Sequence, residues 1–596
     1  MSDYIAPVRD THFVIHETLE AQNMETPGYD ELDRDFTHDV LNAAARIAKE
    51  VFAPLNRIGD QAGCRLDNGV VRTPPGFANA IAELRSGGWF GLEGSAEYGG
   101  QEMPCLLGIA AGEYFASANM SLSMYNGLTQ GAIKTIESHG TEEQKRAYLP
   151  KLNAGSWFAT MNLTEPHCGT DLGLLKSAAT PLGNGNYSIS GEKIFISSGD
   201  HDLSENIVHL LLAKIPGGPE GSRGISLFIV PKFQISGDGS LGSRNGISVS
   251  RIESKMGIKG NATCALRYED SIGQLLGEEH GGLRAMFTMM NAARLHVGLQ
   301  GYAVAEAAYQ SAAAYAGDRL QGRAISGAKY PRLPADPIIV HPDVRRNLLD
   351  QKSFVEGARA LALWCATLID REMRGGDRRS AGLVSLLTPV IKGFLTDKGF
   401  ETAVAAQQVF GGHGYIEDLD ASQRVRDARI TMIYEGANGV QALDLVGRKL
   451  AANGGESVGI LVEKMKNFAE SGSGESWYRD EVLAPLANAA CDLECAAAWL
   501  AEESSNDPDS CLAGSYDFMH LAGYACTGFM WAKMARAAAN ALSDGRMDEM
   551  FLRAKIITGR HYMSRHLPAT RLHLRRIQMG GKNIMALPDD AFQAQL

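Results

Sequence analysis

The sequence of 596 residues contains no run of about 18 consecutive apolar residues, the length that a membrane-spanning helix needs. Its first 20 residues mix charged and apolar side chains and lack the apolar core of a secretory signal. The nine cysteines form no Cys-x-x-Cys pair, which argues against a disulfide framework and fits reduced thiols. These absences predict a soluble, cytoplasmic protein, and we expect no metal site.

An excess of positive charge is also missing. The chain has 57 Lys and Arg against 69 Asp and Glu, a net charge of −12. This argues against a general nucleic-acid binder, because phosphate binding needs a positive field. No G-x-G-x-x-G motif follows a strand-like segment and no G-x-x-x-x-G-K-[ST] motif occurs, so neither a Rossmann dinucleotide site nor a P-loop is indicated. A dinucleotide would have to bind in another way.

The residues that are present alternate between helical and strand-like blocks. Apolar residues at three- and four-residue spacing predict helices, and short alternating runs bounded by Gly, Pro, Asn and Asp predict a small antiparallel β region. This block order is that of an α+β chain with segregated domains. The expected divisions are an N-terminal arm (1–34), a helical domain (35–157), a β domain (158–275), a helical bundle (276–455) and a helical extension (456–596).

Four segments carry candidate chemistry, and each also has an ordinary structural interpretation. Thr164-Glu165-Pro166-His167-Cys168-Gly169-Thr170-Asp171 reads locally as a Pro/Gly loop. About thirty residues later comes Lys193-Ile194-Phe195-Ile196-Ser197-Ser198-Gly199. Gln408-Val409-Phe410-Gly411-Gly412-His413-Gly414-Tyr415 contains a glycine turn between helices. Ile433-Tyr434-Glu435-Gly436 places a carboxylate near a helix start, where the helix dipole also stabilises a plain surface glutamate.

Taken in this order, the segments resemble the acyl-CoA dehydrogenase family of flavoenzymes over about residues 35–450. Through the tail, the chain resembles more weakly a long bacterial subgroup of that family. The resemblance implies an N-terminal helical domain, a middle β-barrel-like domain and a helical-bundle domain, here followed by the extension. It also implies FAD as cofactor and Glu435, which lies 27 residues after Gln408, as catalytic base.

The resemblance implies roles for particular cofactor contacts. Phe195 would lie against the flavin and Ser197 near its N5 atom, where the family more often has Trp and Thr. Arg319 would reach the FAD pyrophosphate of a neighbouring subunit, for which a planar guanidinium suits. The chain diverges after Arg319, so Arg323 stays an alternative. The full set of implied cofactor residues is Met161, Leu163, Thr164, Thr170, Phe195, Ser197, Arg319, Gln408, Gly411 and Gly412.

The implied reaction is α,β-dehydrogenation of an acyl-CoA to a trans-2-enoyl-CoA. Burial beside Tyr434 would raise the proton affinity of the base, and hydride would pass to flavin N5. The implied substrate contacts are Thr170, Arg294, Tyr434, Glu435 and Gly436, although Arg294 also reads as a solvated helix arginine. The subgroup implies 3-(methylthio)propanoyl-CoA as substrate, in dimethylsulfoniopropionate breakdown, with a general short- or medium-chain acyl-CoA as the alternative. Electron-transfer flavoprotein is the expected electron acceptor, and a homodimer or homotetramer the expected assembly.

Three other functions compete with this interpretation. An acyl-CoA oxidase would share every catalytic residue and differ in its access to oxygen. A nitroalkane oxidase is disfavoured, because its base is usually Asp where this chain has Glu435. A DNA-binding flavoprotein would use the basic stretch between Met550 and Pro588, which contains no acidic residue. Its cations are Arg553, Lys555, Arg560, Arg565, Arg571, Arg575, Arg576 and Lys582.

Overall fold

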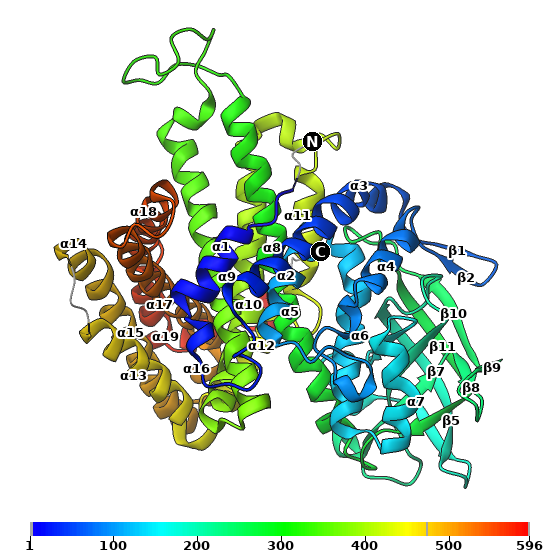
Figure 1. Ribbon diagram of the computed structural model, residues 1–596. Helices are drawn as coiled ribbons and strands as arrows, with labels where there is room; N and C mark the ends of the chain where they lie inside the picture. The colour runs from blue at the N-terminus through cyan, green and yellow to red at the C-terminus, as the bar shows by residue number, and fades with distance from the viewer. Residues whose placement is uncertain (1–3, 472–474, 594–596) are drawn as a thin grey trace. The chain divides into compact units, whose positions relative to one another are not determined.

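The computed structural model describes residues 4–471 and 475–593, which fold into two compact units (Figure 1). The first, called here the mixed unit, comprises residues 4–6 and 43–296. The second, the helical unit, comprises residues 7–42 and residues 297 onward. Two helices have residues in both units: α2 (Arg34–Ile47) and α8 (Gly282–Asp318). Within the described ranges, no helix is long and apolar enough to cross a lipid bilayer.

The mixed unit begins with helices and continues into a sheet. Its helices are α3 (Ala53–Ala62), α4 (Phe77–Ser86), α5 (Cys105–Ala118), α6 (Met120–His139) and α7 (Glu142–Asn153), with a small hairpin of β1 (Arg65–Asp67) and β2 (Val70–Arg72) between α3 and α4. Helix α7 opens on a reciprocal cap. The Thr141 hydroxyl accepts from the Gln144 backbone N–H, and the Gln144 side chain accepts from the Thr141 N–H.

Seven strands of the mixed unit form one sheet. They are β3 (Trp157–Asn162), β4 (Ala178–Pro181), β5 (Asn186–Ser197), β6 (Asn206–Lys214), β7 (Ile225–Pro231), β10 (Ile247–Ile252) and β11 (Thr263–Leu275). The order is β10-β11-β5-β4-β6-β3, and β7 pairs with both β11 and β6. A separate hairpin joins β8 (Phe233–Ile235) to β9 (Leu241–Arg244).

The predicted helical and β organisation is confirmed, with one difference in strand direction. Most pairs are antiparallel as expected, but β3 and β4 both run parallel to β6. The connection 163–177 separates β3 from β4, and β4 starts opposite Lys214, the last residue of β6, at the end of the sheet where β3 finishes. That connection contains the first of the candidate motifs.

Both faces of this sheet are covered by apolar side chains. On β6, Val208, Leu210 and Leu212 belong to a core shared with α6 and α7, because alternate residues of a strand point to the same face. Leu211 and Ala213 belong to a second core on the opposite face. The strand therefore reads as a nearly continuous apolar run, as doubly covered strands do.

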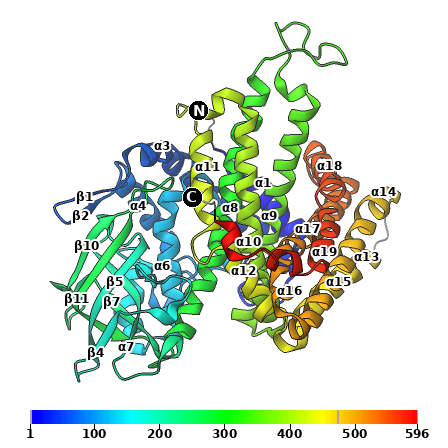
Figure 2. The ribbon, with the colours of Figure 1, turned by 180° about the vertical axis from the view of Figure 1, so that it is seen from behind.

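The helical unit is a bundle of long helices extended by the C-terminal residues. Its remaining helices are α1 (Val8–Phe13), α9 (Pro342–Gly375), α10 (Arg378–Val409), α11 (Ala421–Arg429), α12 (Asn438–Asp444), α13 (Glu456–Glu470), α14 (Ser476–Tyr478), α15 (Ala484–Asn506), α16 (Pro508–Ala513), α17 (Ser515–Ser543), α18 (Glu549–Arg565), α19 (Ala569–Gln578) and α20 (Lys582–Met585). Helix α17 is central, since it packs on α9, α10 and α12 and also on α15, α18 and α19 (Figures 1 and 2). Helices α13 to α20 are called the extension below.

The N-terminal arm is fastened inside the helical unit by buried charges. Asp10 of α1 forms ion pairs with Lys555 of α18 and Arg359 of α9. Lys555 Nζ also lies 2.8 Å from an oxygen of Glu356, and Arg359 lies 2.7 Å from Glu306. Lys555 and Arg359 are only 2% and 1% exposed, so these ions depend on one another for solvation.

Candidate active site

In the mixed unit, the 163–177 connection is organised around the buried carboxylate of Glu165. Its Oε1 accepts from Lys193 Nζ at 2.8 Å and from the Ser177 hydroxyl at 2.6 Å, and its Oε2 accepts from the Lys176 N–H at 2.8 Å. Burial raises the pKa of Glu165, but the charge of Lys193 and the hydrogen bonds from Lys193, Ser177 and Lys176 together outweigh burial and lower that pKa. Burial also lowers the pKa of Lys193, to about 8. This ion pair joins the two motifs that the sequence places thirty residues apart.

The pairing of these two segments also places Thr164 next to Phe195. The Ile194 N–H donates to the Thr164 carbonyl at 2.9 Å, and Lys193 Nζ donates to the Leu163 carbonyl at 3.0 Å. Met161 and Leu163 are half-buried, with side chains packed against the core. Thr170 lies in an exposed part of the loop.

Phe195 has an unusual conformation. The pairing of β5 with β11 shifts register here, so that Ile194 and Phe195 together face the single residue Ala265, which is a β-bulge. Phe195 has a left-handed φ of 59° and is 60% exposed, whereas Ile194 and Ile196 are buried. The bulge turns an aromatic ring out of a buried strand, and half-buried Ser197 follows it. An exposed flat ring beside a hydroxyl suits stacking against a planar ligand.

Arg294, on the part of α8 that belongs to the mixed unit, is only 4% exposed. Its guanidinium carbon lies 6.0 Å from the centroid of the Phe287 ring. The interpretation of Arg294 as a solvated helix arginine is therefore wrong, because tertiary packing encloses a position that helical spacing alone leaves ambiguous. Its implied role as a CoA contact stays a prediction.

In the helical unit, Glu435 lies in the turn between α11 and α12, and the turn is strained. Glu435 has a φ of 57° and Gly436 a φ of 91°, both in the left-handed region. The Gln441 side-chain amide donates to the carbonyls of Glu435 at 3.3 Å and Gly436 at 3.2 Å. The Tyr434 hydroxyl donates to Gln300. Burial and the neighbouring Glu435 charge raise the pKa of Tyr434 well above its usual range, which keeps this hydroxyl a donor.

A separate cavity of the helical unit, about 330 Å³ in volume, gathers three of the predicted cofactor residues. Arg319, Gly411 and Gly412 line it together with Tyr315, Phe410 and His413. Gly411 has a left-handed φ of 57°, and a Cβ at either glycine would meet no protein atom within 4 Å. A guanidinium beside open backbone is a suitable surface for a phosphate-containing group.

Two nearby candidate residues, Gln408 and Arg323, lie outside this cavity. Gln408 is exposed and does not line this cavity, whereas the Gln407 side chain donates to the Gly414 carbonyl at 2.8 Å. Arg323 lies within its own loop, 3.0 Å from the Tyr330 carbonyl and 3.3 Å from Asp336. Of the two arginines left open by the sequence, Arg319 is therefore the one at the cavity.

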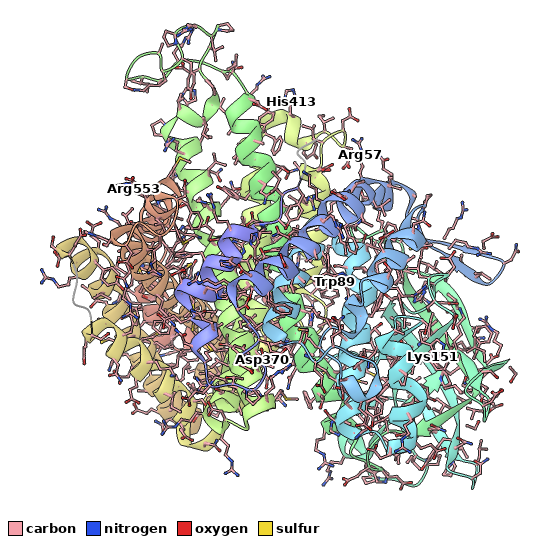
Figure 3. All side chains as sticks on the ribbon, in the orientation of Figure 1. Arg57, Trp89, Lys151, Asp370, His413 and Arg553 are labelled. Carbon is pink, nitrogen blue, oxygen red and sulfur yellow. The ribbon has the colours of Figure 1, made fainter. Side chains whose placement is uncertain are left out.

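His413, which the sequence gave no reason to select, is a wall of the same cavity. Its Nδ1 lies 2.8 Å from the Tyr315 hydroxyl, and Tyr315 stacks on Phe410 with ring centroids 4.5 Å apart. Figure 3 shows His413 near the end of the bundle from which the loop between α8 and α9 extends. The one sequence clue at this cavity is that Tyr315 lies four residues before Arg319, whose N–H donates to the Tyr315 carbonyl at 2.8 Å at the end of α8.

Two clusters in the described residues have metal-ligating side chains within reach of one another: Glu165, His167 and Cys168, and Asp350, His561 and His566. Glu165 is already paired with Lys193. Asp350 faces Arg346 at 2.7 Å and Arg565 at 3.7 Å besides the two histidines. These cations oppose a metal ion electrostatically, so both clusters are read as ion-pair networks.

The basic stretch of the extension is largely neutralised by acidic partners. Six of its eight cations form ion pairs: Arg553 with Glu549, Lys555 with Asp10 and Glu356, Arg560 with Glu481, Arg565 with Asp350, Arg571 with Asp492, and Arg576 with Asp517. These partners come from distant segments as well as from the same helix. The surface is therefore less suited to a nucleic-acid backbone than the sequence alone suggests.

Comparison with protein-family models matches four consecutive regions of the chain. They are the acyl-CoA dehydrogenase N-terminal domain (residues 37–156), its middle domain (160–271), its C-terminal domain (280–450), and the acetyl-CoA dehydrogenase C-terminal-like domain (461–588). The chain belongs to the acyl-CoA dehydrogenase family and is an oxidoreductase of that family. Acyl-CoA dehydrogenases bind FAD.

Individual relatives narrow the resemblance. The chain is 41% identical over 559 residues to 3-methylmercaptopropionyl-CoA dehydrogenase of Ruegeria pomeroyi, covering 93% of this chain and 94% of that protein. It is 32% identical to the broad-specificity linear acyl-CoA dehydrogenase FadE5 of Mycobacterium tuberculosis, covering 99% and 100%. In fold it is similar to a Bacillus anthracis acyl-CoA dehydrogenase complexed with FAD, with a TM-score of 0.74, 22% identity, and 93% and 89% coverage.

Proposed function

We propose that the protein is an FAD-dependent acyl-CoA dehydrogenase in which Glu435 is the base that removes the α-proton of the thioester. The observation that carries the proposal is the turn at Glu435. A non-glycine residue is kept in a left-handed conformation by Gln441, beside a tyrosine fixed on Gln300. Such strain is costly, roughly 1–3 kcal/mol, and is characteristic of functional sites.

Each of these residues has a separate role in the proposed reaction. The Glu435 carboxylate takes the α-proton, and its backbone N–H donates to the thioester oxygen as enolate charge develops. A bound FAD would supply the acceptor for the β-hydrogen, which leaves as a hydride. Phe195 offers an exposed ring for the flavin, and Arg319 offers its guanidinium to a pyrophosphate. The exposed ring and the open glycine backbone both fit this cofactor.

For the substrate we propose 3-(methylthio)propanoyl-CoA. The support is the 41% identity, over almost the whole length, to a relative with that named activity. A linear acyl-CoA, as in the name of the mycobacterial relative, is the second candidate. Electron-transfer flavoprotein is the proposed electron acceptor. A homo-oligomer is proposed because, in the family resemblance, the Arg319 cavity serves the FAD of a neighbouring subunit.

The test is anaerobic reduction of the bound flavin, followed at its visible absorbance, with a panel of acyl-CoAs. We expect 3-(methylthio)propanoyl-CoA to reduce it fastest and Glu435→Gln to slow reduction by roughly 10²–10⁴-fold. Glu417→Gln is the matched control, since Glu417 is 71% exposed and undergoes the same change in charge. Flavin that no thioester reduces would refute the proposal. Rapid peroxide formation in air would favour the oxidase, and salt-sensitive duplex binding would favour the DNA-binding alternative.

A further inference from the structure

A buried hydrogen-bond network lies beside the turn that carries Glu435. Asn438, the first residue of α12, is three residues beyond Glu435 and 5% exposed. Its Oδ1 accepts from Lys392 Nζ at 2.7 Å. Its amide nitrogen lies 2.7 Å from Asp397 Oδ1, 2.9 Å from the Thr396 hydroxyl and 3.1 Å from the Gly393 carbonyl. Helix α10 therefore fixes the start of α12.

Helix α12 in turn supports the backbone at Glu435. One turn after Asn438, the fully buried Gln441 donates to the carbonyls of Glu435 and Gly436. A Cβ on Gly436 would lie 2.5 Å from the Gln441 amide nitrogen, so the two residues already touch. A shift at the start of α12 would therefore move Gln441, whose hydrogen bonds hold the turn at Glu435 and Gly436.

The network continues from Asp397 into the extension. The second oxygen of Asp397 accepts from the Tyr516 hydroxyl and from His520 Nε2, the latter at 2.9 Å, and both residues belong to α17. The His520 ring stacks on His573 of α19 at 5.6 Å. His573 Nδ1 lies 2.6 Å from Asp517.

Apolar packing between α10 and α17 would not require a charged side chain at position 397, yet Asp397 lies there. It is 2% exposed, and burial raises its pKa, but the hydrogen bonds from His520, Tyr516 and Asn438 outweigh burial and lower that pKa. A buried carboxylate is costly unless all its lone pairs are served. Here the two oxygens accept hydrogen bonds from different elements. Oδ1 accepts from Asn438 next to the Glu435 turn, and Oδ2 accepts from Tyr516 and His520 of the extension.

We propose that Asp397, Tyr516 and His520 are positioning residues, through which the extension fixes Asn438 and α12 and thereby the placement of the catalytic base. This inference rests on the proposed function and deepens it. It predicts that the extension acts on the rate of proton abstraction and leaves substrate affinity unchanged. The competing explanation is a structural clip that joins α10 to α17 without influence on Glu435.

The experiment compares His520→Phe, which removes the donor to Asp397, with His520→Gln, which retains an N–H donor. Flavin reduction at saturating 3-(methylthio)propanoyl-CoA, the substrate dissociation constant, FAD content and thermal midpoint are measured for each. We expect His520→Phe to slow reduction on the order of 10- to 100-fold with an unchanged dissociation constant, and His520→Gln to restore much of the rate. Tyr516→Phe, which removes a single hydroxyl, tests the same contact if His520→Phe does not fold.

Thr570→Val is the matched control for stability. It removes another buried hydrogen bond of the extension, 2.9 Å to Asp492, outside this network. We expect it to lower the thermal midpoint without slowing reduction. If His520→Phe and Tyr516→Phe reduce at the wild-type rate while the wild type is active, the positioning role is refuted and the clip remains. If no acyl-CoA reduces the wild-type flavin, the proposed function fails, and this inference with it.

Discussion

Replacing Lys555 with methionine should strongly destabilise the helical unit. The sequence alone suggests an exposed position, because Lys555 lies in the basic stretch between Met550 and Pro588. Lys555 is 2% exposed and pairs with both Asp10 and Glu356. Methionine fills most of the volume but leaves two buried carboxylates with one cation fewer. Removing one partner of a buried ion pair costs roughly 3–5 kcal/mol. For a unit of this size we expect the thermal midpoint to fall by roughly 5–10 °C.

The matched control is Arg553→Met, two residues earlier on the same helix. Arg553, labelled in Figure 3, is 62% exposed and pairs with Glu549 at 2.7 Å. Exposed pairs contribute about 0–1 kcal/mol, so this variant should unfold close to the wild type. Thermal unfolding followed by circular dichroism, with FAD content recorded, measures both. A Lys555→Met midpoint as high as that of the control would show that the buried cluster does not depend on its lysine.

The same cluster makes a prediction about acid. Burial raises the pKa of Asp10, but Lys555 and Arg359 outweigh it and lower the folded-state pKa from 3.8 to about 2. Since the folded value is below the unfolded one, this stabilisation is complete above about pH 4 and is lost as pH falls toward 2. The stability difference between wild type and Lys555→Met should therefore narrow over that interval. A constant difference in urea-unfolding free energy would contradict the assignment to Asp10.

Three further predictions concern the site. Phe195→Ala should weaken FAD binding by roughly 0.5–1.5 kcal/mol, measured as flavin retained per protein after dialysis, with an unchanged thermal midpoint of the apoprotein. Arg319→Ala should lose flavin in the same assay while Arg323→Ala keeps it and unfolds earlier; the reverse result would exchange their roles. Gly436→Ala, whose Cβ would lie 2.5 Å from Gln441, should slow flavin reduction about ten-fold or more while FAD content stays normal, and an unaltered rate would contradict the bracing of this turn.

The order of helices and strands could be predicted because it depends on local periodicity, but the conformation of Phe195 could not. An aromatic residue in an alternating segment is an ordinary strand residue. Its exposure results from a register shift against β11, about seventy residues later in the chain. No local pattern specifies which residue of a strand is the extra one.

Residue pairs distant in sequence also decide the roles of the charged groups. The choice between Arg319 and Arg323 depends on a loop that folds back so that Asp336 meets Arg323. Lys555 looks like part of a basic surface until Asp10, from the opposite end of the chain, is placed beside it. Side-chain type predicts the chemistry available at such positions, whereas the tertiary fold determines the partner.

The extension is joined to the bundle in a way that fixes the axial position of α17. His520 donates to Asp397 on α10, and Trp531 Nε1 donates to the Ser353 carbonyl on α9 at 2.9 Å. The two donors are about three helical turns apart on α17. An apolar face alone would tolerate sliding by a turn, but each of these buried donors meets its acceptor in only one register. These polar contacts therefore specify the axial register of α17 on α9 and α10. The proposed positioning of the turn at Glu435 depends on that register.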